Sequence, residues 1–364
     1  MSPNDNQFMQ RALRLAGRGL FTTEPNPRVG CVLVRDGVVV GEGWHRRAGG
    51  PHAEVAAIRA ADGNTAGCTA YVTLEPCCHT GKTGPCTQAL IDAGITRVVA
   101  AMQDPNPLVA GKGLNLLAEH GIETEVGLLE VAARALNPGF ISRMERGRPF
   151  VRLKMAMSMD GRTAMATGES RWITSDAARA DVQRMRARSS AILTGIGTVT
   201  SDDPRLDVRV DAQDLGLDEG ELNRPLRVVL DSQGRLSSTA RLFDTSGEVL
   251  QVTAPGQGGC EAAQHVEVDT VYGRLDLVEV MLELARREIN EVHAECGPTL
   301  AGSLMLAGLV DELVLYVAPH IMGDNARGLF TLPGLEEMAD RIALNISDTR
   351  MVGSDMRITA CVES

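Results

Sequence analysis

The chain has 364 residues, a length that favours two domains over one. Its apolar fraction of 44% excludes extended disorder, and the absence of any run of about 18 apolar residues excludes a membrane-spanning helix. The formal net charge of −11, from 36 basic and 47 acidic side chains, argues against a nucleic-acid partner, because phosphate backbones need a basic surface. We therefore expect the partner to be a small metabolite.

Cysteine usage and the first residues bear on the compartment. The chain contains eight cysteines without a tight disulfide framework, and its first residues lack the charged and apolar regions of a secretory signal. We therefore expect a cytoplasmic protein.

The predicted elements of the first half alternate between strand and helix after an initial helix. They are a helix over 6–17, strands over 29–34, 38–43, 69–74 and 97–101, and a helix over 113–120. Arg35-Asp36-Gly37, between the first two strands, is a hairpin signal. This order predicts an α/β sandwich.

A domain boundary is expected after the last of these elements. The segment 130–149 mixes charges with glycine and proline, which is typical of a boundary. We place the first domain at residues 1–146 and the second at residues 147–364.

Two short segments of the first half carry metal-binding residues. His52 and Glu54 lie at the predicted start of a helix, Cys77 follows the strand 69–74, and Cys86 opens another predicted helix. One imidazole and two thiolates are three zinc ligands, and they leave the fourth position of a tetrahedral ion open. Glu54 is not needed as a ligand, so it is available to move protons. This is the arrangement of a hydrolytic zinc deaminase, in which an activated water attacks an amine-bearing ring carbon.

A closed structural zinc site is the alternative interpretation, with Cys77, Cys78 or His79 completing four ligands. It explains neither Glu54 nor a histidine that opens a helix far from the cysteines. Adjacent cysteines rarely both reach one tetrahedral ion, so we expect Cys77 to be the ligand and Cys78 a packed thiol. The usual deaminase signature has two residues between its cysteines, whereas eight separate Cys77 from Cys86. We expect this extra loop to contact the substrate.

The second half also alternates strands and helices. Its predicted elements are a strand from 150, a helix over 174–188, and strands over 191–194 and 291–295. The last two strands lead into glycine turns at 195–198 and 296–303. A strand, a turn and a helix N-terminus together can form an anion cradle, although on pattern alone such glycine turns are more often packing features. Thr200 stands where a dinucleotide fingerprint needs its third glycine. The pattern alone therefore predicts an α/β domain with a phosphate site.

Across essentially its whole length, the chain resembles the bifunctional deaminase–reductase family of riboflavin biosynthesis (RibD type). The matching segments are 25–30, 52–54, 75–82 and 104–107 in the first half, and 154–161, 168–174, 195–198, 202–206 and 295–300 in the second. Cys78 and Gly84 depart from the serine and proline common in the family, and neither departure removes a ligand. The resemblance implies an α/β fold, with an N-terminal cytidine-deaminase-like α/β/α sandwich and a C-terminal dihydrofolate-reductase-like α/β domain.

The resemblance also implies the reactions and the deaminase site. The substrate would be 2,5-diamino-6-ribosylamino-4(3H)-pyrimidinone 5′-phosphate, deaminated with one zinc ion to 5-amino-6-(5-phosphoribosylamino)uracil. NADPH would then reduce the ribosyl group to ribityl. In the deaminase half, the residues implied to hold the substrate are Asn26, His45, Lys82, Asp104 and Asn106.

For the reductase half, the resemblance implies Lys154 as the group that polarises the ribose carbonyl and Glu295 as the group that fixes the sugar or relays a proton. The implied substrate positions are Ser170, Arg186, Leu206, Arg209 and Glu295, with Arg205 as a further phosphate contact. The implied cofactor positions are Ala156, Trp172, Thr198, Asp202, Ser232, Gly297, Pro298, Thr299, Leu300, Ala301, Gly302 and Ser303. From the residues alone, Arg186 fits a solvated helix face equally well, Trp172 fits a core equally well, and His293 is expected to be structural.

Two other functions have to be weighed. The second domain could be a nucleotide-binding regulatory module, but simple binding needs neither Lys154 nor Glu295. A polynucleotide deaminase is opposed by the charge of −11. We expect a homo-oligomer, a dimer or a tetramer, although the apolar strand 313–317 fits an interface and a core equally well.

Overall fold

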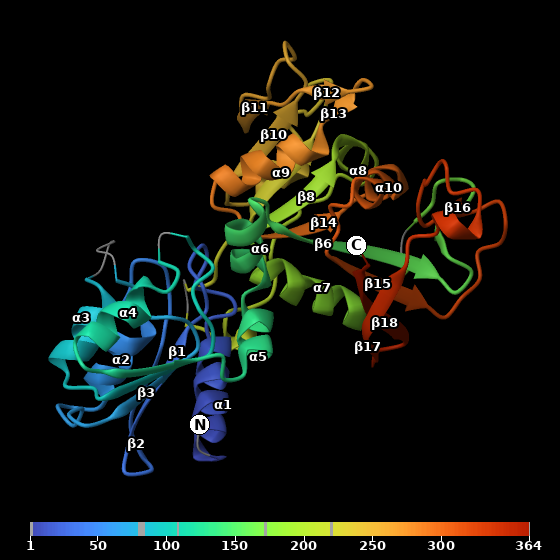
Figure 1. Ribbon diagram of the computed structural model, residues 1–364. Helices are drawn as coiled ribbons and strands as arrows, with labels where there is room; N and C mark the ends of the chain where they lie inside the picture. Colours follow the sequence, from blue (N-terminus) through green and yellow to red (C-terminus); the bar gives the residue numbers. More distant parts are fainter. Residues whose placement is uncertain (1–2, 79–83, 108, 171–172, 219–220, 364) are drawn as a thin grey trace. The chain divides into compact units, whose positions relative to one another are not determined.

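The computed structural model describes residues 3–78, 84–107, 109–170, 173–218 and 221–363. The chain forms two compact units, Met1–Gly147 and Arg148–Ser364, each with its own sheet (Figure 1). Within the described ranges, no helix is long and apolar enough to cross a lipid bilayer.

The first unit is built on a five-stranded sheet with the order β2-β1-β3-β4-β5. Its strands are β1 (Gly30–Arg35), β2 (Val38–Trp44), β3 (Thr69–Val72), β4 (Arg97–Ala100) and β5 (Glu123–Val126). The expected hairpin between β1 and β2 is confirmed, and Asp36 and Gly37 both have the positive φ that a tight turn requires. β3, β4 and β5 are parallel, so their carboxyl ends meet at one edge of the sheet.

Helices cover both faces of this sheet, which confirms the predicted α/β/α sandwich (Figure 1). They are α1 (Pro3–Gly17), α2 (Ala53–Ala60), α3 (Cys86–Asp92), α4 (Lys112–Glu119), α5 (Glu130–Leu136) and α6 (Pro138–Arg146). Side chains from α1, α5 and α6 pack on the face that carries Val32, and those from α2, α3 and α4 pack on the face that carries Leu33. Neighbouring strand residues point to opposite faces, so each strand contributes to both cores.

Helix α2 lies very close to strand β2. An ideal Cβ at Gly41 would be 2.3 Å from the carbonyl oxygen of Ala57, and one at Gly43 would be 2.4 Å from that of Ala53. Only glycine permits this approach of two backbones. The two glycines therefore set the position of the start of α2.

The second unit is built on a nine-stranded sheet with the order β11-β10-β9-β8-β14-β6-β15-β18-β17. Its strands are β6 (Phe150–Ser158), β8 (Ala191–Gly195), β9 (Leu226–Leu230), β10 (Val249–Thr253), β11 (Gln264–Glu267), β14 (Glu291–Glu295), β15 (Glu312–Ala318), β17 (Leu344–Val352) and β18 (Asp355–Val362). The pairs β15–β18 and β17–β18 are antiparallel, and the other described pairs of this sheet are parallel. Strand β15 pairs with β6 and with β18, so the apolar segment 313–317 is part of the core.

The two faces of this sheet differ in chemistry. Helices α9 (Leu277–Arg286) and α10 (Pro298–Leu306) pack on an apolar face, whereas α7 (Asp176–Arg188) and α8 (Ile196–Asp202) pack on the other. Along β14, Val292 and Ala294 belong to the apolar core, and the intervening Glu291, His293 and Glu295 face the other side. Buried charges therefore gather on the face that α7 covers.

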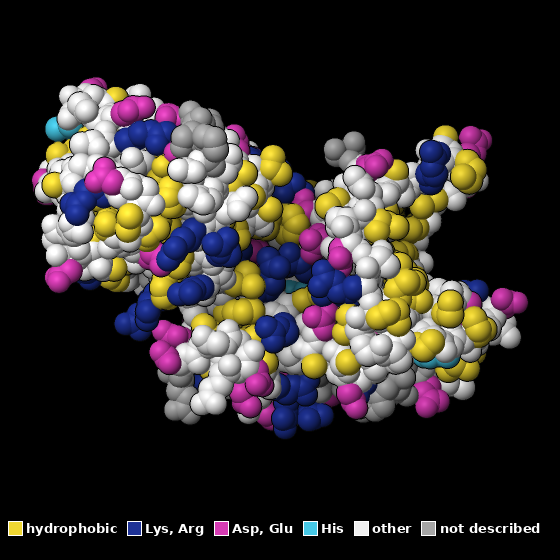
Figure 2. All heavy atoms as spheres, turned by 90° about the horizontal axis from the view of Figure 1, so that it is seen from below, with side chains coloured by type: hydrophobic (Ala, Val, Ile, Leu, Met, Phe, Trp, Pro, Cys, Tyr) yellow, Lys and Arg dark blue, Asp and Glu magenta, His cyan; other side chains and the backbone are white. Residues whose placement is uncertain are grey.

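Smaller elements complete the second unit. They are the pairs β7 (Arg162–Ala164) with β16 (Arg327–Gly328) and β12 (Thr270–Val271) with β13 (Arg274–Leu275), and the 3-10 turns η1 (Gln213–Leu215), η2 (Arg241–Asp244) and η3 (Met338–Asp340). On the face drawn in Figure 2, Asp and Glu side chains are scattered and form no continuous acidic patch.

Candidate active sites

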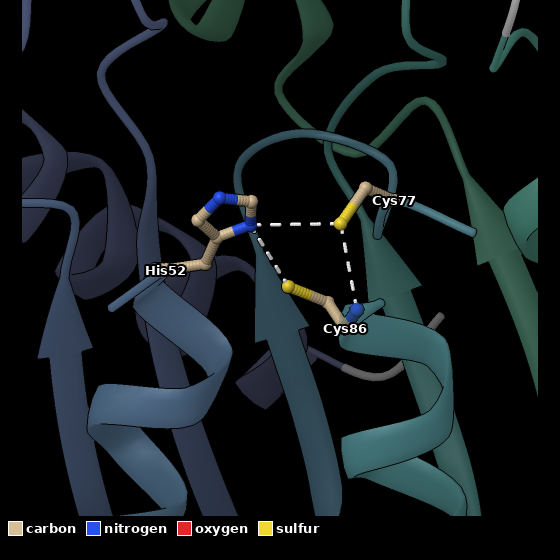
Figure 3. A group of neighbouring side chains, drawn as sticks. All are labelled: His52, Cys77 and Cys86. Atoms are coloured by element: carbon tan, nitrogen blue, oxygen red, sulfur yellow. Dashed lines mark hydrogen bonds between the residues drawn. The ribbon is translucent and has the colours of Figure 1, made fainter. Parts of the chain in front are cut away.

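Three predicted metal ligands meet at the carboxyl end of β3 (Figure 3). His52 is the N-cap residue of α2, Cys86 is the first residue of α3, and Cys77 follows β3. The His52 Nδ1 atom lies 3.1 Å from Cys86 Sγ and 3.5 Å from Cys77 Sγ, and the Cys86 backbone N–H donates to Cys77 Sγ at 3.4 Å. Among the described residues, this is the one group of His, Cys, Asp and Glu side chains arranged to hold a metal ion.

The donor set fits zinc. One imidazole and two sulfur atoms within 4.8 Å of one another suit a single tetrahedral ion and leave one position open. Hydrogen bonding with Cys86, and then with His52, holds the pKa of Cys77 well below its usual value, which favours the thiolate form. Cys78, its half-buried neighbour, is not part of the group in the described structure.

Glu54 lies in the first turn of α2, beside these ligands. Its side chain is 3% exposed. Burial, and next the negative charge of Cys77, raise the pKa of Glu54 to about 7. A carboxyl group with such a pKa takes up and releases a proton near neutral pH, as general acid–base chemistry requires.

Four of the expected deaminase substrate residues form two pairs. Asn26 Nδ2 lies 3.0 Å from His45 Nε2, and the His45 ring centroid is 5.4 Å from that of His52. The Asn106 backbone N–H donates to Asp104 Oδ1 at 2.8 Å. The fifth, Lys82, lies outside the described residues, as does His79 of the alternative zinc site.

In the second unit, the expected catalytic residues are neighbours on parallel strands. Lys154 of β6 is in register with Glu295 of β14. Arg186 of α7 binds the Glu295 carboxylate through two hydrogen bonds, Nε to Oε1 at 2.5 Å and Nη2 to Oε2 at 3.0 Å. With its side chain 9% exposed, Arg186 is a buried ion-pair partner and does not lie on a solvated helix face.

These contacts fix the charge of the pair. Burial opposes ionisation of Glu295, but Arg186 more than offsets it and holds the pKa of Glu295 well below its usual range. Burial lowers the pKa of Lys154, and the charge of Glu295 partly offsets this.

Three of the remaining expected substrate residues, Arg205, Leu206 and Arg209, lie on the loop after α8. Arg186 Nη1 donates to the backbone oxygen of Asp207 at 2.9 Å, which ties α7 to the loop that carries Leu206 and Arg209. Leu206 is buried, whereas Arg205 and Arg209 are exposed. Ser170 is half-buried.

The expected cofactor residues lie along the carboxyl edge of the second sheet. β8 and β14 are adjacent and parallel, and each leads through a glycine N-cap, Gly195 and Gly297, into α8 and α10. An ideal Cβ at Gly297 would meet no atom of the described residues within 4 Å, so a ligand can approach the backbone there. Two adjacent helix N-termini at the ends of parallel strands fit the phosphates of a dinucleotide.

Individual cofactor positions are distributed over this edge. Thr198 and Asp202 lie on α8, Ser232 follows β9, Ala156 lies on β6, and Pro298, Thr299, Leu300, Ala301, Gly302 and Ser303 form the first turns of α10. Trp172 lies outside the described residues.

Two buried residues next to these sites were not assigned from the sequence. His293 is fully buried with its Nε2 atom 3.3 Å from Glu295 Oε1, and its position two residues before Glu295 on a strand was the available signal. Glu75 is 3% exposed and stands two residues before Cys77. The sequence offered no signal for its partners, which lie between 29 and 39 residues later.

Comparisons with known proteins agree with these two sites. The model described as "Cytidine and deoxycytidylate deaminase zinc-binding region" matches residues 2–102, and the model described as "RibD C-terminal domain" matches residues 149–358. The riboflavin biosynthesis protein RibD of Escherichia coli strain K12 is 51% identical, over 97% of this chain and 98% of that protein, and the Haemophilus influenzae protein of the same name is 50% identical, over 98% and 97%. The chain belongs to the RibD family.

Solved structures of RibD proteins share the whole architecture. A structure of Acinetobacter baumannii RibD has a TM-score of 0.91 and 43% identity over 99% of both chains. A Thermotoga maritima structure, titled a diaminohydroxyphosphoribosylaminopyrimidine deaminase/5-amino-6-(5-phosphoribosylamino)uracil reductase, has a TM-score of 0.87 and 34% identity over 99% of both. This RibD chain is thus a bifunctional deaminase–reductase of riboflavin biosynthesis, with zinc in its cytidine-deaminase-like domain and NADPH as the reductant of its dihydrofolate-reductase-like domain.

Proposed function

We propose that residues 1–146 deaminate 2,5-diamino-6-ribosylamino-4(3H)-pyrimidinone 5′-phosphate, and that residues 147–364 reduce the ribosyl group of the product. The single observation that carries the first step is the meeting of His52, Cys77 and Cys86 beside the buried Glu54. The overall chemistry balances: water replaces the ring amine and ammonia leaves, and then one hydride and one proton are added.

In the deaminase, we assign zinc binding to His52, Cys77 and Cys86. When bound, zinc acts as a Lewis acid that makes a water molecule acidic enough to lose a proton near neutral pH. Glu54 accepts this proton on its carboxylate and passes it to the ring nitrogen of the pyrimidine. It then takes the proton of the hydroxyl group that has been added to the ring carbon and delivers it to the departing amine, so that the carbonyl forms as ammonia leaves. A pKa of about 7 suits a group that must act as both base and acid in one turnover.

Substrate binding in this half belongs to Asn26, His45, Lys82, Asp104 and Asn106. The Nδ1 atom of His45 lies 3.0 Å from the backbone oxygen of Pro51, which holds the ring next to the segment that carries His52. The side chains of Asn26 and His45 therefore offer donors and acceptors to the pyrimidine edge close to the metal ligands. Lys82 suits the phosphate as a point charge.

In the reductase, we assign Lys154 as the proton donor that polarises the ribose carbonyl. Because Arg186 keeps Glu295 ionised, Glu295 is an acceptor that holds a sugar hydroxyl and favours the charged form of Lys154; it does not serve as a proton donor. NADPH supplies the hydride. The helix N-termini after Gly195 and Gly297 bind its phosphates, and Arg186, Ser170, Leu206, Arg205 and Arg209 surround the substrate.

The test is mass spectrometry of the pyrimidine phosphate after incubation with the zinc-loaded enzyme, with and without NADPH. We expect an amine-to-carbonyl change without cofactor, and two further hydrogens only with NADPH. Deamination under both conditions without reduction would leave the second unit a binding module. No change under either condition would leave the three ligands a structural site.

We also propose that the chain forms a homo-oligomer through β17. This outer strand of the nine-stranded sheet exposes seven of its nine residues, among them Leu344 at 40%, Ile346 at 60% and Met351 at 65% exposure. A long edge strand with apolar side chains on it is a template for pairing with another strand. The opposite edge strand, β11, has only four residues and carries Gln264 and Glu267. The same strand of a second copy is therefore the occupant we propose for the β17 edge.

Light scattering after size exclusion tests this association. We expect at least twice the chain mass of 38.8 kDa for the natural protein and about one chain mass for Ile346→Glu, whose charge would be buried on pairing. Met338→Glu, at a position that is 77% exposed in η3, is the control and is expected to keep the natural mass. A monomeric natural protein at micromolar concentration would contradict the proposal.

We propose a cytoplasmic location on the basis of the cysteines. All eight lie within the described ranges and none forms a disulfide, as a reducing compartment favours. Fractionation of cells that produce the protein, followed by assay of deaminase activity in each fraction, tests this location.

A further inference from the structure

The buried carboxylate of Glu75 has no role in the mechanism above, yet its contacts are extensive. Its side chain is 3% exposed and accepts four backbone hydrogen bonds. Oε2 accepts from the N–H groups of Asp104 at 3.1 Å and Gly111 at 2.9 Å, and Oε1 accepts from those of Gly113 at 2.9 Å and Leu114 at 3.3 Å. All four donors come from a segment that begins about 30 residues later in the chain.

These hydrogen bonds cap the N-terminus of helix α4, which has no side-chain cap of its own in the described part of the chain. Its N-cap residue, Gly111, has a left-handed φ of 77°, and among the described residues no side chain of the helix's own start caps it. The first N–H groups of a helix have no partners within the helix, and the helix dipole favours a negative charge beside them. Glu75 provides this charge and these acceptors from the neighbouring strand end.

The start of α4 also touches the segment that carries the zinc ligand. An ideal Cβ at Gly113 would lie 2.0 Å from the carbonyl oxygen of Pro76, so the two backbones are in direct contact. Cys77 follows Pro76 immediately. If α4 shifted relative to Glu75, it would therefore displace Pro76, the residue next to the metal ligand Cys77.

The same carboxylate anchors the loop that carries two proposed substrate residues. Asp104 donates its backbone N–H to Glu75, and its own Oδ1 accepts the N–H of Asn106 at 2.8 Å. Asp104 is 8% exposed, so this arrangement is shielded from water. A continuous chain of hydrogen bonds thus runs from Glu75 through Asp104 to Asn106.

We propose that Glu75 is a positioning residue of the deaminase, which holds the Asp104–Asn106 loop at a fixed place relative to Cys77. The inference rests on the proposed function, because the roles of Cys77, Asp104 and Asn106 are assigned there. A carboxylate suits this task, because its two oxygens offer four acceptor sites and no donor to clash with four N–H groups. Glutamine has nearly the same shape but presents one NH₂ group to those donors.

The test is steady-state deamination by Glu75→Gln. Because Asp104 and Asn106 hold the substrate, we expect kcat/KM to fall about 10–100-fold, mainly through a higher KM, while zinc content stays at one per chain. The loss should be smaller in an Asn106→Ala background, because the two residues act through one chain of contacts. Gly113→Ala keeps the carboxylate but places a Cβ 2.0 Å from the Pro76 oxygen and 3.2 Å from Glu75 Oε1, which pushes α4 away from both. This variant should raise KM as well, and it carries the test if Glu75→Gln does not fold.

Asp5→Asn is the matched control. Asp5 is another buried carboxylate of the first unit, 2% exposed, which accepts from Tyr71 at 2.7 Å and from Arg97 at 3.0 Å. This variant should lower the melting temperature and leave KM unchanged. A natural KM in Glu75→Gln, additive losses in the double variant, a loss of zinc in Glu75→Gln, or an equal rise of KM in Asp5→Asn would each overturn the positioning role. Absence of deamination in the natural enzyme would instead overturn the proposed function.

Discussion

Glu54 owes its acid–base character to its place in the first turn of α2, where burial and the thiolate of Cys77 raise its pKa to about 7. We predict that Glu54→Gln lowers the kcat of deamination by about 10²–10⁴-fold, because the amide cannot carry a proton, while zinc remains bound. Kinetics together with metal analysis checks this. Glu42→Gln, at an ion pair with Arg11 on the surface of the same unit, should change neither quantity. Loss of zinc from the Glu54 variant would show that the residue is structural.

We predict that loss of the proton from Lys154 sets the alkaline limb of the reductase pH profile. Burial lowers its pKa below the usual 10.5, and the charge of Glu295 partly offsets this. Because the ammonium form donates the proton, the rate should fall as pH rises through this lowered pKa, so the limb should lie below pH 10.5. Stability changes with pH in the opposite direction. Between the lowered pKa of Lys154 in the folded protein and its usual value in the unfolded chain, the unfolded chain binds more protons, so the free energy of unfolding rises with pH in this range.

The check on Lys154 is kcat measured against pH, for the natural enzyme and for Lys154→Gln. The variant should have a low rate without this limb, because glutamine does not titrate. A limb at or above pH 10.5, or one that persists in Lys154→Gln, would contradict the assignment.

For single residues, roles that depend on the neighbouring sequence could be predicted, whereas contacts with residues far away in the chain could not. His52, Cys77 and Cys86 were identifiable because each stands at the predicted end of an element that delivers it. The role of Arg186 was ambiguous, because no residue near it in the sequence indicates that it pairs with Glu295, which lies 109 residues away. His293 stands only two residues before Glu295, and its Nε2 atom lies 3.3 Å from Glu295 Oε1, so the strand spacing was a local signal for this contact.

Among the elements, the contact of α2 with β2 decides where two functional residues lie. We predict that Gly43→Ala lowers the free energy of unfolding by about 1–3 kcal/mol, because its Cβ would be 2.4 Å from the backbone of Ala53. Since α2 begins next to His52 and carries Glu54, its displacement should also weaken zinc binding. Chemical denaturation and zinc titration measure the two effects.

A glycine with open space provides the comparison for Gly43. A Cβ at Gly17, the last residue of α1, would meet none of the described atoms within 4 Å. Gly17→Ala should therefore leave stability and zinc affinity close to natural. Equal losses in the two variants would show that the close approach of α2 is not their cause.

The sequence predicts whether a segment forms a helix or a strand, but it does not predict which strands are neighbours in the sheet. The hairpin at Arg35-Asp36-Gly37 and the helix predicted over 174–188 follow from local signals. Both are confirmed, the helix as α7 with Ser175 as its N-cap residue. That β14 lies between β8 and β6 could not be predicted, because pairing in a parallel sheet is decided by packing between distant segments. This pairing is what brings Lys154 beside Glu295.

At the scale of the molecule, each unit has its own sheet and its own hydrophobic core. We predict that removing zinc with a chelator abolishes deamination and leaves NADPH-dependent reduction of 5-amino-6-(5-phosphoribosylamino)uracil close to natural. The assay is NADPH oxidation before and after chelation, with zinc added back to restore deamination. Parallel loss of both activities on chelation would show that the metal supports the second unit as well.

The strand order of the second unit constrains its assembly during synthesis. β6 is the first strand of that unit to leave the ribosome, yet both of its neighbours, β14 and β15, belong to residues 291–318. In the first unit, by contrast, β1 finds its neighbour β2 after a two-residue turn. A nascent chain can therefore fold its metal-binding half early. Both edges of β6, in contrast, stay unpaired until most of the remaining chain has been synthesised. Premature termination before residue 291 would leave the deaminase complete and the reductase sheet divided.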